Sequence, residues 1–129
     1  MEKPHKDILI ERWFEKSDDA IKTAELNLEA NLLTSALNRI YYGIFYVVMG
    51  LAEKHDFKTS KHAKLMGWFN KKFIYENKTF SPEIFEVYKL SFAHRQNSDY
   101  DAMYTPDLET ATRLLADAKK FIEEVKKVI

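Results

Sequence analysis

Apolar residues recur three and four positions apart along most of the chain, which is the spacing of one face of an α-helix. The most continuous apolar stretch, residues 35–52, is apolar on almost every side at this spacing, yet it carries Asn38 and Arg39 near its start. A helix that is apolar all round in a globular protein is covered on several sides. We therefore predict that residues 35–52 form a central helix around which the other segments pack.

Four more segments have helical patterns. Their predicted bounds are about 8–31, 60–73, 81–96 and 105–129, and the central helix is predicted to run from Thr34 or Ser35, either of which could cap it, to about His55. Ser60 is the predicted cap of the short third helix. Residues 75–79 and 97–104 break the periodicity and are predicted to be loops.

The last two helices begin with similar signatures. Ser81-Pro82-Glu83 and Thr105-Pro106-Asp107 both place a proline and an acid near a helix start, where proline is tolerated and negative charge meets the positive end of the helix dipole. Together, the five helical segments predict an all-α fold. It is an antiparallel up-and-down bundle of four long helices and one short helix, forming a single domain over residues 1–129.

Two glycines interrupt the central helix. Gly43 and Gly50 are seven residues apart and therefore lie on nearly one face. Each costs about 1 kcal/mol of helix stability relative to alanine, so we expect another helix to approach closely there. A helix of a dimer partner is one candidate.

The composition excludes several classes of protein. Cysteine is absent, which excludes disulfides, thiolate catalysis and cysteine-bound zinc. The longest apolar run, residues 40–52, is well short of the ~20 residues needed to cross a bilayer. The N-terminal stretch has no cleavable signal pattern, so we expect the protein to stay in the cytoplasm, with no membrane contact.

Charge is balanced over the whole chain but unevenly distributed. The formal net charge is zero, while residues 54–78 hold seven lysines against two acids. This basic segment has two interpretations: a solvated lysine face on a short helix, or a contact surface for RNA or a nucleotide.

Common catalytic motifs are absent from the sequence. It contains no glycine-rich phosphate loop, no HExxH pair and no GxSxG elbow. The histidines, His5, His55, His62 and His94, include no pair three or four residues apart, so we predict neither a metal nor a cofactor. His62 is interpreted as a contact at a helix start.

A polar cluster, HRQNSDYD at residues 94–101, ends the fourth helix. In a structural interpretation, Arg95 offsets the negative end of the helix dipole, and Asp99 or Asp101 pairs with Arg39 or Arg95. In a functional interpretation, Arg95 holds a phosphate while Tyr100 or His94 assists. Both interpretations stay open at the level of the sequence.

Three stretches together, SALNRIYYGIF, KTSKHAKLMGWF and HRQNSDYD, resemble the small stand-alone prokaryotic proteins of the HEPN superfamily. Their pattern is an N-R-x-Y-Y-x-x-F helix followed later by R-x-x-x-D-Y. The first motif is matched by Asn38, Arg39, Tyr41, Tyr42 and Phe45, and the second by Arg95, Asp99 and Tyr100. The resemblance covers roughly residues 8–125, with the motifs in the right order.

The resemblance implies an up-and-down bundle of four or five helices, commonly a homodimer that brings the arginine motifs together. Many such proteins are metal-independent ribonucleases that use an arginine with a histidine four to six residues later, often beside a minimal nucleotidyltransferase antitoxin. This chain departs from that pattern, because no histidine comes after Arg95 and the residue five positions later is Tyr100. A phenol, with an ordinary pKa of about 10, is a poor general base near neutral pH.

We therefore carry three hypotheses. The first is a dimeric binding module that acts with a minimal nucleotidyltransferase in a toxin-antitoxin or stress system and contacts RNA or nucleotide phosphate. The second is a ribonuclease that uses Arg95 with Tyr100 or His94, and the third is a purely structural cluster. The candidate ligand-binding residues are Asn38, Arg39, Tyr42, His62 and His94, and the catalytic candidates are Arg95, Asp99 and Tyr100.

Overall fold

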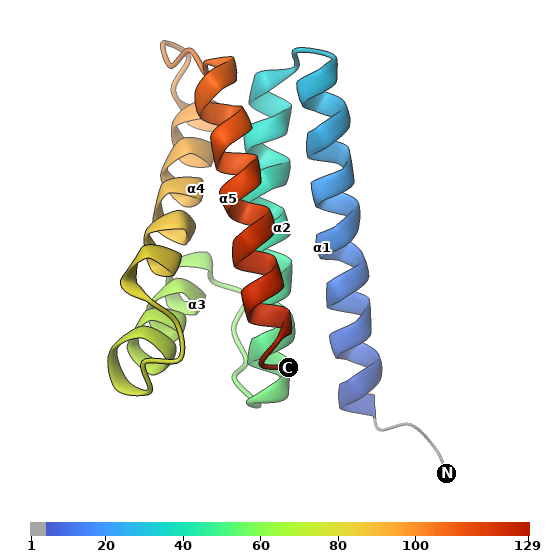
Figure 1. Ribbon diagram of the computed structural model, residues 1–129, viewed down its shortest axis with the longest axis vertical. Helices are drawn as coiled ribbons and strands as arrows, with labels where there is room; N and C mark the ends of the chain where they lie inside the picture. Colours follow the sequence, from blue (N-terminus) through green and yellow to red (C-terminus); the bar gives the residue numbers. More distant parts are fainter. Residues whose placement is uncertain (1–4) are drawn as a thin grey trace.

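The structure is a computed structural model that describes residues 5–129, and these residues form helices without any strand. The helices are α1 (His5–Glu29), α2 (Leu33–Lys54), α3 (His62–Phe69), α4 (Pro82–Tyr100) and α5 (Leu108–Lys126), and a π-helical segment, η1 (Asn70–Glu76), continues α3. The four long helices run alternately up and down, with α3 at one end of the bundle (Figure 1). The predicted all-α fold is confirmed.

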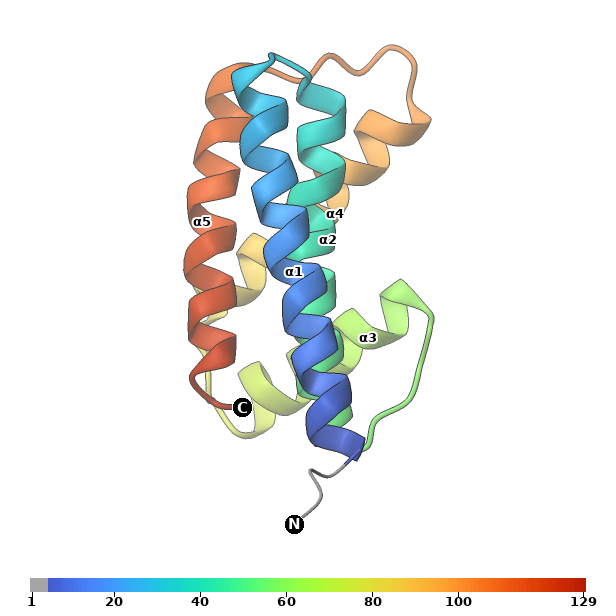
Figure 2. The same ribbon diagram turned by 90° about the vertical axis from the view of Figure 1, so that its right-hand side faces the viewer.

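Helix α2 is the central element, as its sequence predicted. It contacts α1, α3, α4 and α5. Twelve of its 22 residues are buried, which a helix with a single apolar stripe could not achieve. Figure 2 shows α5 on one side of α1 and α2, and α3 on the other. Because α2 is covered on all these sides, its few polar side chains can reach the surface of the bundle at only a few places.

The close approach predicted at the glycines is made by α1 of the same chain. A Cβ atom built on Gly43 would lie 2.6 Å from Cδ1 of Ile21, and one on Gly50 would lie 3.2 Å from a ring carbon of Phe14. The buried Ser17 hydroxyl donates a hydrogen bond of 2.7 Å to the Gly43 carbonyl. The candidate dimer partner is therefore wrong for this face of α2, since α1 covers it.

An aromatic cluster joins α3 to the rest of the bundle. Phe69 is fully buried at its centre. Its ring neighbours are Phe73, Phe80, Phe85, Tyr88 and Phe121. Beside this cluster, Trp68 stacks on Phe57 with ring centroids 4.8 Å apart. The other tryptophan, Trp13, stacks on Tyr46 between α1 and α2.

Some helix ends differ from the predictions by one to four residues. Helix α1 ends at Glu29, and Asn31 adopts a left-handed φ of 58°, which asparagine tolerates better than most residues. Helix α2 then starts at Leu33, so the two predicted caps lie inside its first turn and no side chain caps it. Lys61, not Ser60, precedes α3, and its amide donates a hydrogen bond of 3.1 Å to the Thr59 hydroxyl.

The starts of the last two helices follow the predicted signatures in different ways. Ser81 caps α4, and its hydroxyl accepts a hydrogen bond from the Ile84 amide at 3.4 Å. Asp107 caps α5, two residues after Thr105, because its carboxylate reaches both the amide and the hydroxyl of Thr110 at 2.8 Å. A carboxylate at this position also meets the positive end of the helix dipole.

The predicted loop at 97–104 is wrong in its first half. Helix α4 continues to Tyr100, and only the residues after it form the connection to α5. An ion pair between Arg95 and Asp99, one helical turn apart, supports this extension. Similarly, η1 occupies the start of the loop predicted at 75–79.

No helix within residues 5–129 combines the length and the apolar character needed to cross a membrane. Residues 1–4, part of the N-terminal stretch for which no signal pattern is predicted, lie outside the described residues.

Candidate functional site

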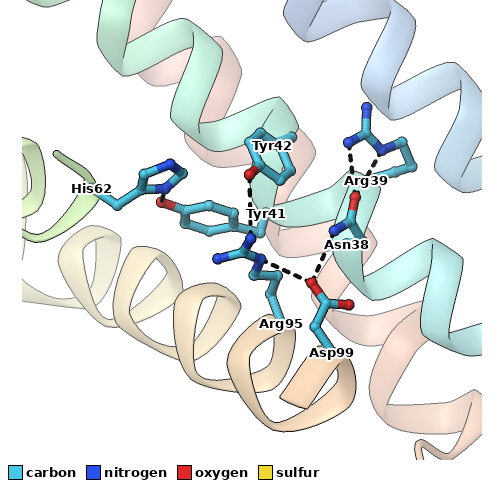
Figure 3. A network of polar contacts seen from close by, with 7 residues as sticks. All are labelled: Asn38, Arg39, Tyr41, Tyr42, His62, Arg95 and Asp99. Carbon is cyan, nitrogen blue, oxygen red and sulfur yellow. Dashed lines mark hydrogen bonds and ion pairs between the residues drawn. The ribbon is translucent and has the colours of Figure 1, made fainter. Parts of the chain in front are cut away.

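One carboxylate joins α2 to the end of α4. Asp99 Oδ2 lies 3.0 Å from Nε of Arg95, and the same oxygen accepts a hydrogen bond of 3.0 Å from Nδ2 of Asn38 (Figure 3). The extension of α4 brings Arg95 and Asp99 onto one face, and α2 presents Asn38 opposite them. The predicted pairing of an aspartate with an arginine in this cluster is therefore made by Arg95.

Arg39 reaches the carboxylate only through Asn38. Its Nε and Nη2 both donate to Oδ1 of Asn38, at 3.0 and 2.8 Å, and its guanidinium lies 4.9 Å from the centre of the Tyr42 ring. It lines a separate polar groove of about 450 Å³ beside α1. Asp101 is not a partner of either arginine, because its carboxylate accepts the Met103 amide in a turn.

Arg95 is enclosed by aromatic rings. Its guanidinium carbon lies 5.6 Å from the ring centre of Tyr41, 5.4 Å from that of Tyr42 and 5.6 Å from that of Tyr100. Nη2 donates a hydrogen bond of 3.3 Å to the Tyr42 hydroxyl. The Arg95 side chain is only 14% exposed. Cation-π contacts of this kind hold the guanidinium in one orientation.

The guanidinium of Arg95 still has free hydrogen-bonding capacity. An arginine has five N–H donors. Within residues 5–129, Arg95 makes one directed hydrogen bond, to Tyr42, while Nε meets Asp99 as an ion pair without good hydrogen-bond alignment. Donors are left over for an anion that enters from the adjoining pocket, and a planar guanidinium suits a phosphate or a carboxylate.

The pocket beside Arg95 has a volume of about 750 Å³, within the range of ordinary small-ligand sites. Tyr100, on its rim, is 73% exposed, so the pocket opens to solvent. Its lining residues are His62, Phe92, Arg95, Gln96, Asn97, Tyr100 and Asp101. Three elements of the fold therefore meet here: the start of α3, the second half of α4 and, behind them, the tyrosines of α2.

His62 is held rigidly on the wall of this pocket. Its ring stacks on Phe45 with centroids 4.3 Å apart and planes 8° from parallel, and its Nδ1 lies 2.6 Å from the Tyr41 hydroxyl (Figure 3). Burial, together with the positive charge of Arg95, lowers the pKa of His62 below its ordinary value. The imidazole is therefore neutral near pH 7.

Tyr41 is fully buried, and burial raises its pKa far above the ordinary value, although Arg95 opposes that shift. The phenol therefore keeps its proton at any physiological pH. The sequence placed Tyr41 in the core stripe of α2 and gave no sign of its hydrogen bond, because its partner His62 is 21 residues away on another helix. Gln96 and Asn97 are further pocket residues that sequence reasoning did not single out.

His94 lies outside the Arg95 pocket. Its Nδ1 is 2.7 Å from the hydroxyl of Tyr104, in the connection between α4 and α5. Burial, with a smaller contribution from the charge of Asp107, raises the pKa of Tyr104. The structure thus separates the two histidines that were candidates: His62 lines the pocket with Arg95, and His94 does not.

Within the part of the chain that the structure describes, histidine, aspartate and glutamate side chains nowhere gather in a group of three or more that could hold a metal ion. The chemistry available at the pocket is that of a guanidinium, an imidazole, a phenol, two amides and the carboxylate of Asp101.

Comparison with known proteins supplies the family context for this geometry. The family model that describes the HEPN domain matches residues 10–128. A UPF0332 protein of Thermotoga maritima is 31% identical over 96% of this chain and 93% of its own length. Two proteins of Methanocaldococcus jannaschii, both named "Putative toxin", are 30% and 27% identical over 93% of this chain; the match covers 81% and 88% of their lengths.

Proposed function

Because the chain belongs to the HEPN-domain family, we propose that it has a toxin-like role in which the Arg95 pocket binds a phosphate group of RNA or of a nucleotide. The observation that carries the proposal is the Arg95 guanidinium, which is oriented by Asp99 and Tyr42 and keeps donors free beside a pocket of suitable size. Such a preorganised donor set favours a phosphate over a neutral ligand.

The basic segment of the sequence supports RNA as the ligand. His62 belongs to that segment and lines the pocket. Lys61 and Lys64, on either side of His62 in the sequence, are exposed, and the side chain of neither makes a hydrogen bond or ion pair within residues 5–129. Lysines beside an arginine site attract the neighbouring phosphates of a strand without reading its sequence.

Replacing Arg95 with glutamine should lower the affinity for a single-stranded RNA oligonucleotide roughly tenfold to a hundredfold, because hydrogen bonds to a charged group contribute about 1.5–3 kcal/mol. Glutamine keeps a donor near Tyr42 and Asp99, which limits structural damage. Fluorescence anisotropy at one fixed salt concentration measures the change, and circular dichroism checks the fold.

The matched control for this experiment is Arg113→Gln. Arg113 is an exposed arginine on α5 that pairs with Glu109, away from the pocket. Its loss removes the same charge but should change the affinity less than threefold. Equal losses in the two variants would show nonspecific charge attraction and would contradict a site at Arg95.

The family resemblance also leads us to propose a homodimer that acts with a minimal nucleotidyltransferase in a toxin-antitoxin or stress system. Light scattering coupled to size exclusion should give twice the mass of the chain. A nucleotidyltransferase encoded beside this chain should co-purify with it. A monomer that retains no such partner would refute this part of the proposal.

A further inference from the structure

Arg39 is held in a fixed position by uncharged groups. Its Nε and Nη2 donate to Oδ1 of Asn38, and the guanidinium lies over the Tyr42 ring. Within residues 5–129, Arg39 forms no ion pair, whereas Arg95 is paired with Asp99. A guanidinium has five N–H donors, so the two hydrogen bonds to Asn38 leave donors over. The positive charge of Arg39 is therefore oriented, but no carboxylate of the described chain neutralises it directly.

The groove that Arg39 lines is polar throughout. It lies between α1 and the start of α2, has a volume of about 450 Å³, and is called the Arg39 groove below. The uncharged residues of its lining carry hydroxyl or amide groups: Thr23, Asn27, Thr34, Ser35 and Asn38. Asp99 is the one acid among the described residues that line it, and Arg95 already offsets that charge. A cation surrounded by neutral hydrogen-bonding groups suits an anion with several acceptor oxygens, such as a phosphate.

The positive surface continues along α1. A smaller hollow of about 210 Å³ shares Thr23 and Arg39 with the groove and is also lined by Lys16, Asp19 and Tyr46. Lys16 is exposed, and its ammonium lies 5.8 Å from the centre of the Tyr46 ring. Asp19 offsets one of the two cations of this hollow, so one positive charge remains. A row of cations beside aromatic rings is typical of a surface that follows the backbone of a nucleic-acid strand.

The Asn38 and Asp99 side chains separate the Arg39 groove from the Arg95 pocket. Asp99 lines the groove and is paired at 3.0 Å with Arg95, which lines the pocket. Figure 3 shows the two arginines on either side of Asn38 and Asp99, which are joined by a hydrogen bond of 3.0 Å. Because these two side chains stand between the hollows, one phosphate cannot occupy both. A ligand that carries phosphates at intervals along a backbone can.

We propose that the Arg39 groove is a second phosphate-binding subsite, so that the preferred ligand is a strand with one phosphate at Arg95 and another at Arg39. This inference rests on the proposed binding of RNA phosphate at Arg95. It assigns to Arg39 a contact that adds affinity without reading the base. The strand is single, because Tyr100, exposed on the rim of the Arg95 pocket, offers its ring to an unpaired base.

The test compares a ligand with one phosphate and a ligand with several. Adenosine 5′-monophosphate is titrated by calorimetry, and a short single-stranded RNA oligonucleotide by fluorescence anisotropy. Arg39→Gln should lower the affinity for the strand roughly tenfold and change that for the monophosphate less than twofold, whereas Arg95→Gln should lower both. The slope of log affinity against log salt should also fall by about 0.7 in Arg39→Gln, because one fewer phosphate is neutralised.

Ser35→Asp tests the groove while keeping Arg39. Ser35 is exposed, lines the groove and lies one helical turn before Arg39, so an aspartate there would pair with the guanidinium. An acid in the first turn of α2 also meets the positive end of the helix dipole, which protects the fold. The strand affinity should again fall roughly tenfold. Thr79→Asp adds the same charge before α4, at the other end of the bundle, and should change it less than threefold (Figure 1).

Three outcomes overturn the inference and leave the proposed function in place. In the first, Arg39→Gln weakens strand binding no more than Arg113→Gln does. In the second, Arg39→Gln weakens the monophosphate and the strand equally, which means that Arg39 acts on the Arg95 pocket through Asn38. In the third, it weakens ATP as much as the strand, which assigns the groove to a nucleoside polyphosphate. Wild-type protein that binds none of these ligands would instead refute the proposed function itself.

Discussion

Replacing Phe69 with alanine should lower the free energy of unfolding by about 3–5 kcal/mol, the usual cost of emptying a buried phenylalanine site. Phe69 has no exposed surface and is in ring contact with residues from η1, α4 and α5. Its neighbours are large rings that cannot collapse into the space without losing their own contacts. Urea denaturation followed by circular dichroism measures the loss.

Tyr75→Ala is the matched control for the Phe69 variant. Tyr75 is an aromatic residue of the adjoining η1 segment and is 80% exposed, so its removal should change the free energy of unfolding by less than about 0.5 kcal/mol. Similar losses in the two variants would mean that the aromatic cluster does not anchor α3. Because α3 carries His62, the Phe69 variant should also disturb the pocket more than the Tyr75 variant does.

Gly43→Val should destabilise the protein by about 1–3 kcal/mol, because the Ile21 side chain of α1 occupies the space that valine needs. Even a Cβ atom would lie 2.6 Å from Ile21, and valine adds two further methyl groups. Separating the helices to make room would stretch the buried hydrogen bond from Ser17 to the Gly43 carbonyl. The same urea titration measures this variant.

Gly67 provides the opposite case. It lies inside α3, but no atom lies within 4 Å of a Cβ built on it, so Gly67→Val should change stability by less than about 0.5 kcal/mol. Combining Gly43→Val with Ile21→Ala should recover about 1 kcal/mol relative to the sum of the single changes, because the two side chains compete for one space. Simple additivity would contradict a direct clash.

The fold was predictable because its signals are local and repeated. The all-round apolar character of α2 extends over many residues, and apolar spacings of three and four recur along most of the chain, so the errors in the predicted helix bounds fell at the helix ends. At the end of α4, polar residues such as Asn97 and Asp99 have weak helix propensity. Tertiary contacts override that preference, since Asp99 meets both Arg95 and Asn38.

The site was predictable only in part. The motifs pointed to Arg95, Asp99 and Asn38, and the structure brings these three together. The pairing of Tyr41 with His62 depends on how α3 docks after an irregular connection, and no periodicity in the sequence reports that docking. Binding of RNA phosphate by these residues is the prediction that the Arg95→Gln experiment tests.

The two tryptophans give the protein a built-in optical readout of its separate parts. Trp13 lies on α1 against Tyr46, and Trp68 lies on α3 against Phe57. In a Trp13→Phe background, the intrinsic tryptophan fluorescence would therefore come from Trp68 on α3 alone. A change in emission when RNA is added would then report movement of the helix that carries His62, in real time and without an attached dye.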